Sequence, residues 1–472
     1  MSNATAIVPE LERTGQHALA SYLGSCDPAH ADAIAAQLDR FDLDHLARLI
    51  DRYGRAYEPP PIDTDLEPAP YYALGGQWDR DAYEHAGEDL VRAGKVACFV
   101  VAGGQGSRLG FEGPKGCFPA ACVSGKTLFG IFAESIRTAQ EQYDATIPWL
   151  VMTSPLNHDE TVGFFGEHDH FGLDPDDVFF FNQGVMPSFD KETGDLLLSA
   201  PDALATNPDG HGGAYGAIER SGTLDELERR GVEHLSYFQV DNPHTRIIDP
   251  VFLGLHATAP DSSGEISSKM VAKTAWDEKV GVFCRAGGRT RIVEYSDLPE
   301  SLAKKTTPDG TLAFDAGSVA LHTMSLAFIR KVLADPERAL PFHRAVKKVP
   351  YFDTQRAERI EPEEPNGIKL ERFVFDALGV ADRSIVIETD RIEEFAPVKN
   401  AAGTDSIESS KRLQTERAAR WLERYGVQIP RDGEGGVDAT IEIPPRVALC
   451  AEDLKGRDLP DRIDRGAEVI IG

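Results

Sequence analysis

The chain has 472 residues and a formal net charge of −28, and hydrophobic residues make up 41% of it. This length suits roughly two or three domains, and the negative charge argues against binding to nucleic acid or to an anionic membrane. No apolar run approaches the ~20 residues of a membrane-spanning helix, and the N-terminus lacks the segments of a secretory signal. The six cysteines show no CxxC or zinc spacing. We therefore expect a cytoplasmic protein with reduced thiols.

The predicted elements begin with helices. Apolar residues recur at helical spacing between about residues 16 and 57. The prolines at 59–61 then break the chain and open an extended connector, and a second short helix is predicted at 79–92. Nothing in this part indicates chemistry, so we predict that residues 1–93 form an N-terminal helical lobe.

From residue 94 the pattern alternates between strand and helix, which is typical of a doubly wound α/β fold. We predict a catalytic domain over residues 94–383. In such a sheet ligands bind at the carboxyl ends of the strands, where Gly103, Gln183 and Asp241 fall. Strands are predicted at 96–102, 149–152, 178–181 and 235–240, and helices at 127–142, 159–168 and 214–230.

After residue 250 the pattern changes to short runs that alternate like antiparallel strands. We predict that they form a small extra sheet for the second substrate; the runs are 267–273, 280–285, 291–295 and 318–324. A C-terminal domain is predicted over residues 384–472, ending in a small β module. A helix predicted at 369–378 precedes this domain. Within it we predict a strand at 384–388, a helix at 409–425 and strands at 440–443 and 446–450.

The most informative stretch is residues 96–116, VACFVVAGGQGSRLGFEGPKG. A buried strand that runs into Gly103 and Gly104 lets the backbone pass close to a ligand and direct N–H groups at anionic oxygens. Arg108 and Lys115 then add two cations, so the stretch predicts a cradle for a nucleoside triphosphate. It is not a P-loop, because no Gly-Lys-Ser/Thr closes it. Leu109 occupies the place of the third glycine of a dinucleotide fingerprint, which argues against an NAD-dependent oxidoreductase.

Further candidates each have a plainer alternative. Asp241 ends a strand and can hold Mg²⁺ between phosphates, although an Asx turn explains the same residue. His211 lies in a glycine loop that enters a helix, or is an exposed loop histidine without a role. Glu294 can accept hydrogen bonds from sugar hydroxyls, or is an edge-strand glutamate. Lys399, in EFAPVKN, can reach a sugar phosphate, or is a surface lysine.

The sequence shows no Ser/His/Asp or Cys/His constellation and no cluster of metal ligands. The chemistry that it indicates is therefore the alignment and neutralisation of two anions, as in nucleotidyl transfer. Lys269, Lys273 and Lys369 are weaker candidates for phosphate contacts.

The loop GGQGSRLG with PKG resembles the signature loop of nucleotidyltransferases that make nucleotide sugars. From about residue 39 to 400 the chain resembles the eukaryotic UDP-N-acetylglucosamine pyrophosphorylases, within the UDP-sugar pyrophosphorylase family. The segments that carry the resemblance follow in order: KTLFGIFAE, IPWLVMTS, FFNQGVMPSFD, PDGHGG, VDN, VGVFC, IVEYSD, PYFDTQ, PNGIKLERFVFD and EFAPVKN.

This resemblance implies a Rossmann-like core of the GT-A kind with a mixed sheet, an N-terminal helical lobe and a small C-terminal β domain. It implies an enzyme that makes UDP-sugar and pyrophosphate from UTP and a sugar 1-phosphate, with Mg²⁺. N-acetylglucosamine 1-phosphate is the first choice, and a UDP-glucose or broad-specificity pyrophosphorylase is the alternative. A non-catalytic UDP-sugar-binding protein is a further alternative. We expect a monomer or homodimer.

The resemblance also implies roles for individual residues. Arg108, Lys115 and Lys399 would be the catalytic cations, and Asp241 would hold the metal. The nucleotide would be bound by Val101, Ala102, Gly103, Gly104, Gln183, Gly210, His211 and Asp241, and the sugar by Gly281, Glu294, Asp315, Phe373 and Phe375. His211 and Asp315 stand where the N-acetylglucosamine enzymes usually have Asn, which keeps glucose 1-phosphate open as the substrate.

Overall fold

The computed structural model describes residues 3–58 and 65–472, which divide into two compact units. The first unit holds Met1–Ile62, Gln183–Gly213 and Leu340–Val374, and the second holds the rest of the chain. The predicted proline connector at 59–61 lies outside the described residues. The three domains predicted from the sequence stay a prediction.

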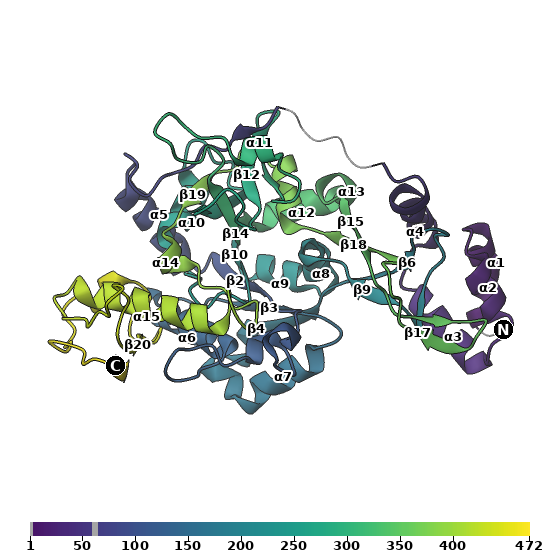
Figure 1. The fold of residues 1–472 in the computed structure, drawn as a ribbon, viewed down its shortest axis with the longest axis horizontal. Coiled ribbons are helices and arrows are strands. Elements are labelled where there is room, and N and C mark those ends of the chain that lie inside the picture. The colour runs from purple at the N-terminus through teal and green to yellow at the C-terminus, as the bar shows by residue number, and fades with distance from the viewer. Residues whose placement is uncertain (1–2, 59–64) are drawn as a thin grey trace. The chain divides into compact units, whose positions relative to one another are not determined.

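The first unit begins with helices, which confirms the helical pattern predicted between about residues 16 and 57 (Figure 1). The short helix predicted at 79–92 is confirmed as α5 Arg80–Arg92, but it belongs to the second unit. The carboxylates of Asp27 and Asp42 cap α3 and α4, because each accepts a hydrogen bond from a backbone N–H of the first helical turn. Leu38, Leu46 and Leu49 are buried in the apolar core of this unit. The helices are α1 Asn3–Arg13, α2 His17–Leu23, α3 Pro28–Leu38 and α4 Leu43–Ile50, followed by the π-helical turn Asp51–Arg55.

The same unit contains a three-stranded sheet of β6 Phe189–Asp190, β15 Phe342–Lys347 and β18 Gly367–Arg372. Part of the helix predicted at 369–378 is therefore wrong. Ile368 and Leu370 are buried while Lys369 between them is half-buried, which is the period-two pattern of a strand. A 3₁₀ helix follows at Val374–Val380.

The second unit is built on a mixed sheet in the order β1-β12-β14-β10-β2-β3-β4 (Figure 1). Its central strands, β2 Val96–Val101, β3 Trp149–Thr153, β4 Val178–Asn182 and β10 His234–Gln239, are parallel, which confirms the doubly wound prediction. Thr127 caps the helix between β2 and β3. The helix predicted at 214–230 is divided, because Gly222 has a φ of 75°. The helices are α6 Leu128–Tyr143, α7 His158–Glu167, α8 Ala214–Arg220 and α9 Thr223–Arg229.

The antiparallel strands join this sheet, so the separate small sheet predicted after residue 250 is wrong. β14 Ala316–Ser325 pairs directly with β10, with Leu235 opposite Met324. Both residues are buried, so pairing on the existing sheet covers their apolar surface. The other strands are β1 Glu67–Pro68, β11 Ile266–Ala272, β12 Val282–Ala286 and β13 Arg289–Val293.

Residues 384–472 belong to the second unit. The predicted strand at 384–388 is confirmed as β19 Val386–Glu388, which pairs with β11, and the predicted helix is α15 Ile407–Glu423. β20 Thr440–Glu442 pairs with β21 Glu468–Ile470, and Trp421 and Leu422 of α15 pack on this region. The strand predicted at 446–450 is wrong, because these residues form turns.

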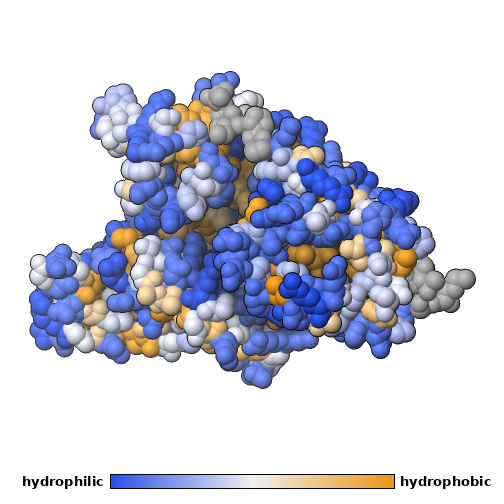
Figure 2. Space-filling view, turned by 45° about the vertical axis from the view of Figure 1, so that its right-hand side comes forward, coloured by the Kyte–Doolittle hydropathy of each residue, from blue (hydrophilic) through white to orange (hydrophobic). Residues whose placement is uncertain are grey.

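The surface agrees with the acidic composition. Hydrophilic side chains cover most of the face in Figure 2, and hydrophobic ones emerge in small scattered groups. No helix among residues 3–58 and 65–472 is long and apolar enough to cross a membrane.

Candidate active site

Two neighbouring parallel strands of the sheet, β2 and β10, define the site. From β2 the chain moves to β3 and β4 on one side, and it returns to pair β10 on the other side of β2. Val101 of β2 lies beside Gln239 of β10, and the Val240 N–H donates to the Val101 carbonyl at 3.2 Å. The order of the strands reverses between them, and such a reversal opens a crevice at the carboxyl ends of the strands. Gly103 and Asp241 both emerge at this edge.

The glycine loop after β2 is a narrow hairpin. The Gly106 N–H donates to the Gly113 carbonyl at 2.9 Å, and the Lys115 N–H donates to the Gly104 carbonyl at 3.0 Å. A Cβ atom at Gly106 would lie 2.7 Å from Phe111 Cδ1, so a side chain does not fit there. A Cβ atom at Gly104 would meet nothing within 4 Å. One side of the hairpin is therefore packed, and the exposed Gly104 lies on an open side.

The nearby cations are available to a ligand. Arg108 is exposed and Lys115 is half-buried, and neither side chain forms an ion pair or hydrogen bond with another described residue. In a chain with a net charge of −28, carboxylates outnumber the cations, so two cations without a carboxylate partner are notable. Val101 and Ala102, which precede the glycines, are 8% and 0% exposed, so only their main-chain atoms could face a nucleotide.

The end of β10 binds the segment that carries Lys399. The Asp241 carbonyl accepts from the Val398 N–H at 2.8 Å. The buried Asn242 donates from Nδ2 to the Glu394 carbonyl at 2.7 Å and accepts at Oδ1 from the Ala396 N–H at 3.0 Å. The sequence analysis did not single out Asn242, although an amide directly after a strand-end aspartate was a visible signal. The Lys399 ammonium is 43% exposed and lies 3.8 Å from an Asp405 carboxylate oxygen.

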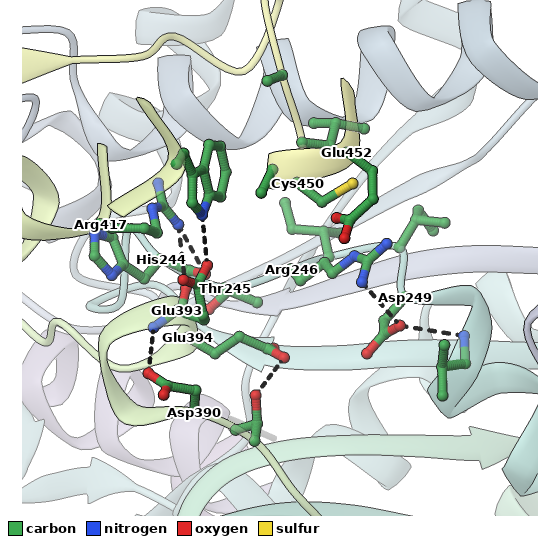
Figure 3. Close-up of a pocket in the computed structure, with 18 of the residues that line it drawn as sticks. His244, Thr245, Arg246, Asp249, Asp390, Glu393, Glu394, Arg417, Cys450 and Glu452 are labelled. Atoms are coloured by element: carbon green, nitrogen blue, oxygen red, sulfur yellow. Dashed lines mark hydrogen bonds and ion pairs between the residues drawn. The ribbon is translucent and has the colours of Figure 1, made fainter. Parts of the chain in front are cut away.

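Behind this segment lies a polar network (Figure 3). Lys269, 2% exposed, places its Nζ 2.6 Å from Asp249 Oδ2 and 2.6 Å from Glu394 Oε2. Thr389 donates to the other Glu394 oxygen at 2.6 Å. Burial opposes ionisation of Asp249, but Lys269 and Arg246 together hold its pKa below the usual range. Lys269 therefore fixes α14 Arg391–Glu394 and does not remain free for a phosphate.

The network borders a cavity of about 310 Å³. Arg417 of α15 donates to the carbonyls of His244 and Glu393 at 3.5 and 3.2 Å, and the Trp421 indole donates to a Glu393 carboxylate oxygen at 2.8 Å. In Figure 3 the guanidinium of Arg246 points toward Asp249. These contacts tie α14 and α15 to the chain that follows β10.

The sugar candidates lie farther along the sheet. Val282 pairs with Val293, so Gly281 and Glu294 face each other across the β12–β13 hairpin. A Cβ atom at Gly281 would lie 3.6 Å from Glu294 Oε1. A glycine there leaves room beside the carboxylate. The structure thus brings these two candidates together.

Asp315 meets a residue that the sequence analysis missed. The Tyr71 hydroxyl donates to Asp315 Oδ2 at 3.1 Å. Burial raises the pKa of Asp315, and this hydrogen bond opposes the rise. Burial and the nearby Asp315 also raise the pKa of Tyr71 to about 12, so its proton stays in place. No pattern in the sequence linked two residues so far apart.

The uracil candidates lie in the first unit. Gln183 is buried and donates from Nε2 to the Gly210 carbonyl at 2.7 Å. Gly210 has a φ of 85°, and a Cβ atom there would lie 2.3 Å from the Arg372 carbonyl oxygen, so glycine is required. The structure therefore brings Gln183 and Gly210 together at one point.

His211 belongs to a stack of rings in the same unit. Its ring centroid is 5.2 Å from that of Phe373, and the His343 ring, which the sequence analysis missed, lies 4.3 Å from Phe373. His211 Nδ1 accepts from the Val374 N–H at 3.1 Å, so the ring proton is on Nε2. Burial lowers the pKa of His211 to about 4, which keeps the ring neutral at pH 7. Phe375 is buried, as core packing also predicts.

The single carboxylate at the end of β10 fits a magnesium ion that would take its other oxygen ligands from the substrate and from water. Asp241 is half-buried, and its carboxylate forms no ion pair or hydrogen bond with another described residue. No group of three His, Cys, Asp or Glu side chains within residues 3–58 and 65–472 could hold a metal. Mg²⁺ often takes one or two carboxylates and completes its shell with phosphate oxygens and water.

A mixed sheet with a parallel core, a glycine loop, two cations without an ion pair among the described residues and a strand-end aspartate are the features expected of a nucleotidyltransferase. Comparison with known proteins agrees, since the sequence model of the family described as UTP–glucose-1-phosphate uridylyltransferase matches residues 70–417. The chain belongs to the UDP-sugar pyrophosphorylase family of sugar-1-phosphate uridylyltransferases.

Individual relatives cover nearly the whole chain. UDP-N-acetylglucosamine pyrophosphorylase of Saccharomyces cerevisiae is 34% identical over 399 residues, which are 83% of this chain and 82% of that protein. UDP-N-acetylhexosamine pyrophosphorylase-like protein 1 of Xenopus tropicalis is 34% identical over 94% of this chain and 92% of its own. The crystal structure of the Trypanosoma brucei uridine diphosphate N-acetylglucosamine pyrophosphorylase superimposes with a TM-score of 0.82 at 25% identity, covering 98% of both chains.

Proposed function

We propose that this protein makes UDP-N-acetylglucosamine and pyrophosphate from UTP and N-acetylglucosamine 1-phosphate, with Mg²⁺. The single observation that carries the proposal is the pair of unengaged cations, Arg108 and Lys115, beside the glycine loop at the reversal of strand order. The names of the relatives in yeast and Trypanosoma brucei favour the N-acetylated sugar.

The residues divide the work by position. Main-chain N–H groups of the glycine loop bind the triphosphate, and Arg108 and Lys115 neutralise the charge that develops on the leaving pyrophosphate. Lys399 binds the phosphate of the sugar, whose oxygen attacks the α-phosphorus in line. Asp241 supplies the protein carboxylate for Mg²⁺, which neutralises the phosphates when it is bound. Gln183 and Gly210 contact the uracil, and Glu294 accepts from sugar hydroxyls.

No protein nucleophile is required by this arrangement. The Asp241 carbonyl accepts from the Val398 N–H, one residue before Lys399, and this main-chain contact supports the proposal that the two side chains act together. Two bound anions aligned in this way approach each other as in an intramolecular reaction. Catalysis then rests on positioning and on charge neutralisation.

A second candidate, UDP-glucose synthesis, is favoured by Asp315. An ionised carboxylate accepts hydrogen bonds and cannot donate to an acetamido carbonyl. The sugar pocket of this chain therefore lacks one donor that an amide would provide.

The test is pyrophosphate release from UTP and Mg²⁺ across a panel of sugar 1-phosphates, with the full chain. We expect release with N-acetylglucosamine 1-phosphate at the highest kcat/KM. A higher kcat/KM for glucose 1-phosphate would establish the second candidate. Absence of release with every sugar would contradict uridylyl transfer by this protein.

A further inference from the structure

The turn after β3 contains a buried amide that contacts the glycine loop. Asn157 is 1% exposed and directly precedes α7, yet its side chain does not cap that helix. Instead Nδ2 donates to the Ala102 carbonyl at 2.9 Å and to the Gly104 carbonyl at 3.3 Å. These two carbonyls flank Gly103, the first glycine of the loop.

The other end of the same amide is also fixed. Asn157 Oδ1 accepts from the Ser154 N–H at 2.8 Å and from the Ser154 hydroxyl at 3.1 Å. An asparagine has two N–H donors and one carbonyl oxygen with two lone pairs, and here all of them are used. The side chain therefore has one orientation, in which its donors face the loop.

Because the peptide units are planar, the position of Asn157 also sets the direction of the N–H groups in the glycine loop. In a planar trans peptide the C=O and the following N–H point in opposite directions. Holding the Ala102 and Gly104 carbonyls toward Asn157 turns the N–H groups of Gly103 and Gln105 away from it. No hydrogen bond joins the N–H groups of residues 103–105 to another described residue, so they are available to an external acceptor.

We propose that Asn157 is a positioning residue, which fixes the glycine loop so that its free N–H groups face the phosphates of UTP. The inference rests on the proposed function, and it assigns to the β3–α7 turn a part of the nucleotide site. Asn157 touches no reacting atom, because it acts through the main chain of residues 102–105. Since these N–H groups bind the triphosphate before and during the reaction, their alignment affects nucleotide binding more than kcat.

The test compares UTP affinity, measured by titration calorimetry with Mg²⁺ on the full chain, between the wild type and Asn157→Asp. The substitution keeps the shape but replaces the two N–H donors by a carboxylate oxygen that repels both carbonyls. We expect the Kd and the KM for UTP to rise by roughly 10-fold or more, as for the loss of buried hydrogen bonds. We expect kcat to change by less than about threefold, the pattern of lost uniform binding.

A matched control is Asn366→Asp. Asn366 also uses both ends of its amide, accepting from the Val349 N–H at 2.8 Å and donating to the Val349 carbonyl at 3.1 Å. Its main chain bonds to Lys347 and Lys191, and no hydrogen bond joins it to the glycine loop or to the described Gln183 and Gly210. We expect its Kd for UTP to match the wild type. A merely structural amide would lower the melting temperature in either variant and leave the Kd for UTP of folded protein unchanged.

Ser154→Ala is a second test variant, to be used if Asn157→Asp does not fold. It removes one of the two contacts that orient Asn157 Oδ1, and we expect a Kd for UTP raised about two- to threefold. Unchanged UTP affinity in the folded variants would overturn the role of Asn157. A wild type that does not bind UTP would instead overturn the proposed function, so the two failures are distinguishable.

Discussion

The two strand ends on either side of the reversal build their halves of the site by different means. At the end of β2 the groups proposed to bind UTP are main-chain N–H groups and two cations within 12 positions of Gly103, and one buried amide, Asn157, contacts the loop. At the end of β10 the groups proposed to bind the metal and the sugar phosphate are the side chains of Asp241 and Lys399, which are 158 positions apart in the sequence. There Asn242 and the Lys269 network hold a distant segment in place. The β2 half is local, whereas the β10 half depends on tertiary structure.

The largest effect is expected from removing the buried cation of the β10 half. Lys269→Met leaves Asp249 and Glu394 buried without their shared partner. Breaking a buried pair from one side typically costs about 3–5 kcal/mol, so we expect a loss of this size in the free energy of unfolding by urea. Lys273→Met is the control, because Lys273 Nζ forms no ion pair with the carboxylates of residues 3–58 and 65–472 and donates to the Trp276 carbonyl. Equal stability of Lys269→Met and wild type would show that the β10 half does not depend on this network.

The β2 half predicts a kinetic effect. Lys115→Ala removes a cation that follows the charge on the leaving pyrophosphate, so we expect kcat to fall on the order of 10²-fold or more while UTP binding weakens less. Because the Lys115 side chain forms no ion pair or hydrogen bond with another described residue, stability should change little. Steady-state kinetics and a thermal melt measure both. An unchanged kcat with a raised KM would make Lys115 a ground-state binding residue.

Acid should also destabilise a contact at the start of β10. Burial lowers the pKa of His256 to about 3, and its ring contacts that of His234 at the start of β10. The unfolded state takes up a proton near pH 6.5 and the native state does not, so stability falls as the pH drops below about 6.5. We expect a loss of roughly 2 kcal/mol from His256 at pH 5, measured by urea unfolding. His256→Asn should flatten this dependence, and an unchanged pH slope in that variant would contradict it.

The smallest effect concerns the sugar. Asp315→Asn restores an N–H donor next to Tyr71, and it should move the ratio of kcat/KM toward N-acetylglucosamine 1-phosphate and away from glucose 1-phosphate. One hydrogen bond of about 1 kcal/mol corresponds to roughly fivefold. The ratio is measured with both sugars under the same conditions. If it stayed the same, Asp315 would have no part in selecting the sugar.

The same contrast between local and distant contacts explains what could be predicted from the sequence. The glycine loop was predictable because its strand, glycines and cations are contiguous. The parallel core was predictable because its strands are continuous apolar runs. The extra sheet was wrong because nothing local to residues 316–325 says that they pair with β10. The strand at Gly367–Arg372 was mistaken for a helix because a short apolar pattern fits both periods.

The supporting residues escaped prediction for a physical reason. Asn157 is 55 positions from the Ala102 carbonyl, and Asn242 is 152 positions from the Glu394 carbonyl. Main-chain carbonyls carry no sequence signal, so a side chain that binds one cannot be paired with it before the fold is known. Candidate ligands such as Gly103, Asp241 and Lys399 could be named from the sequence, but the amides that position them could not.

The most direct test of the account follows the α-phosphate of UTP. The full chain is incubated with UTP labelled at the α-phosphate, Mg²⁺ and N-acetylglucosamine 1-phosphate, and the products are separated. The account predicts that the label enters UDP-N-acetylglucosamine in step with the release of one pyrophosphate per product formed. Bound UTP with no label in any UDP-sugar, from this or another sugar 1-phosphate, would contradict it.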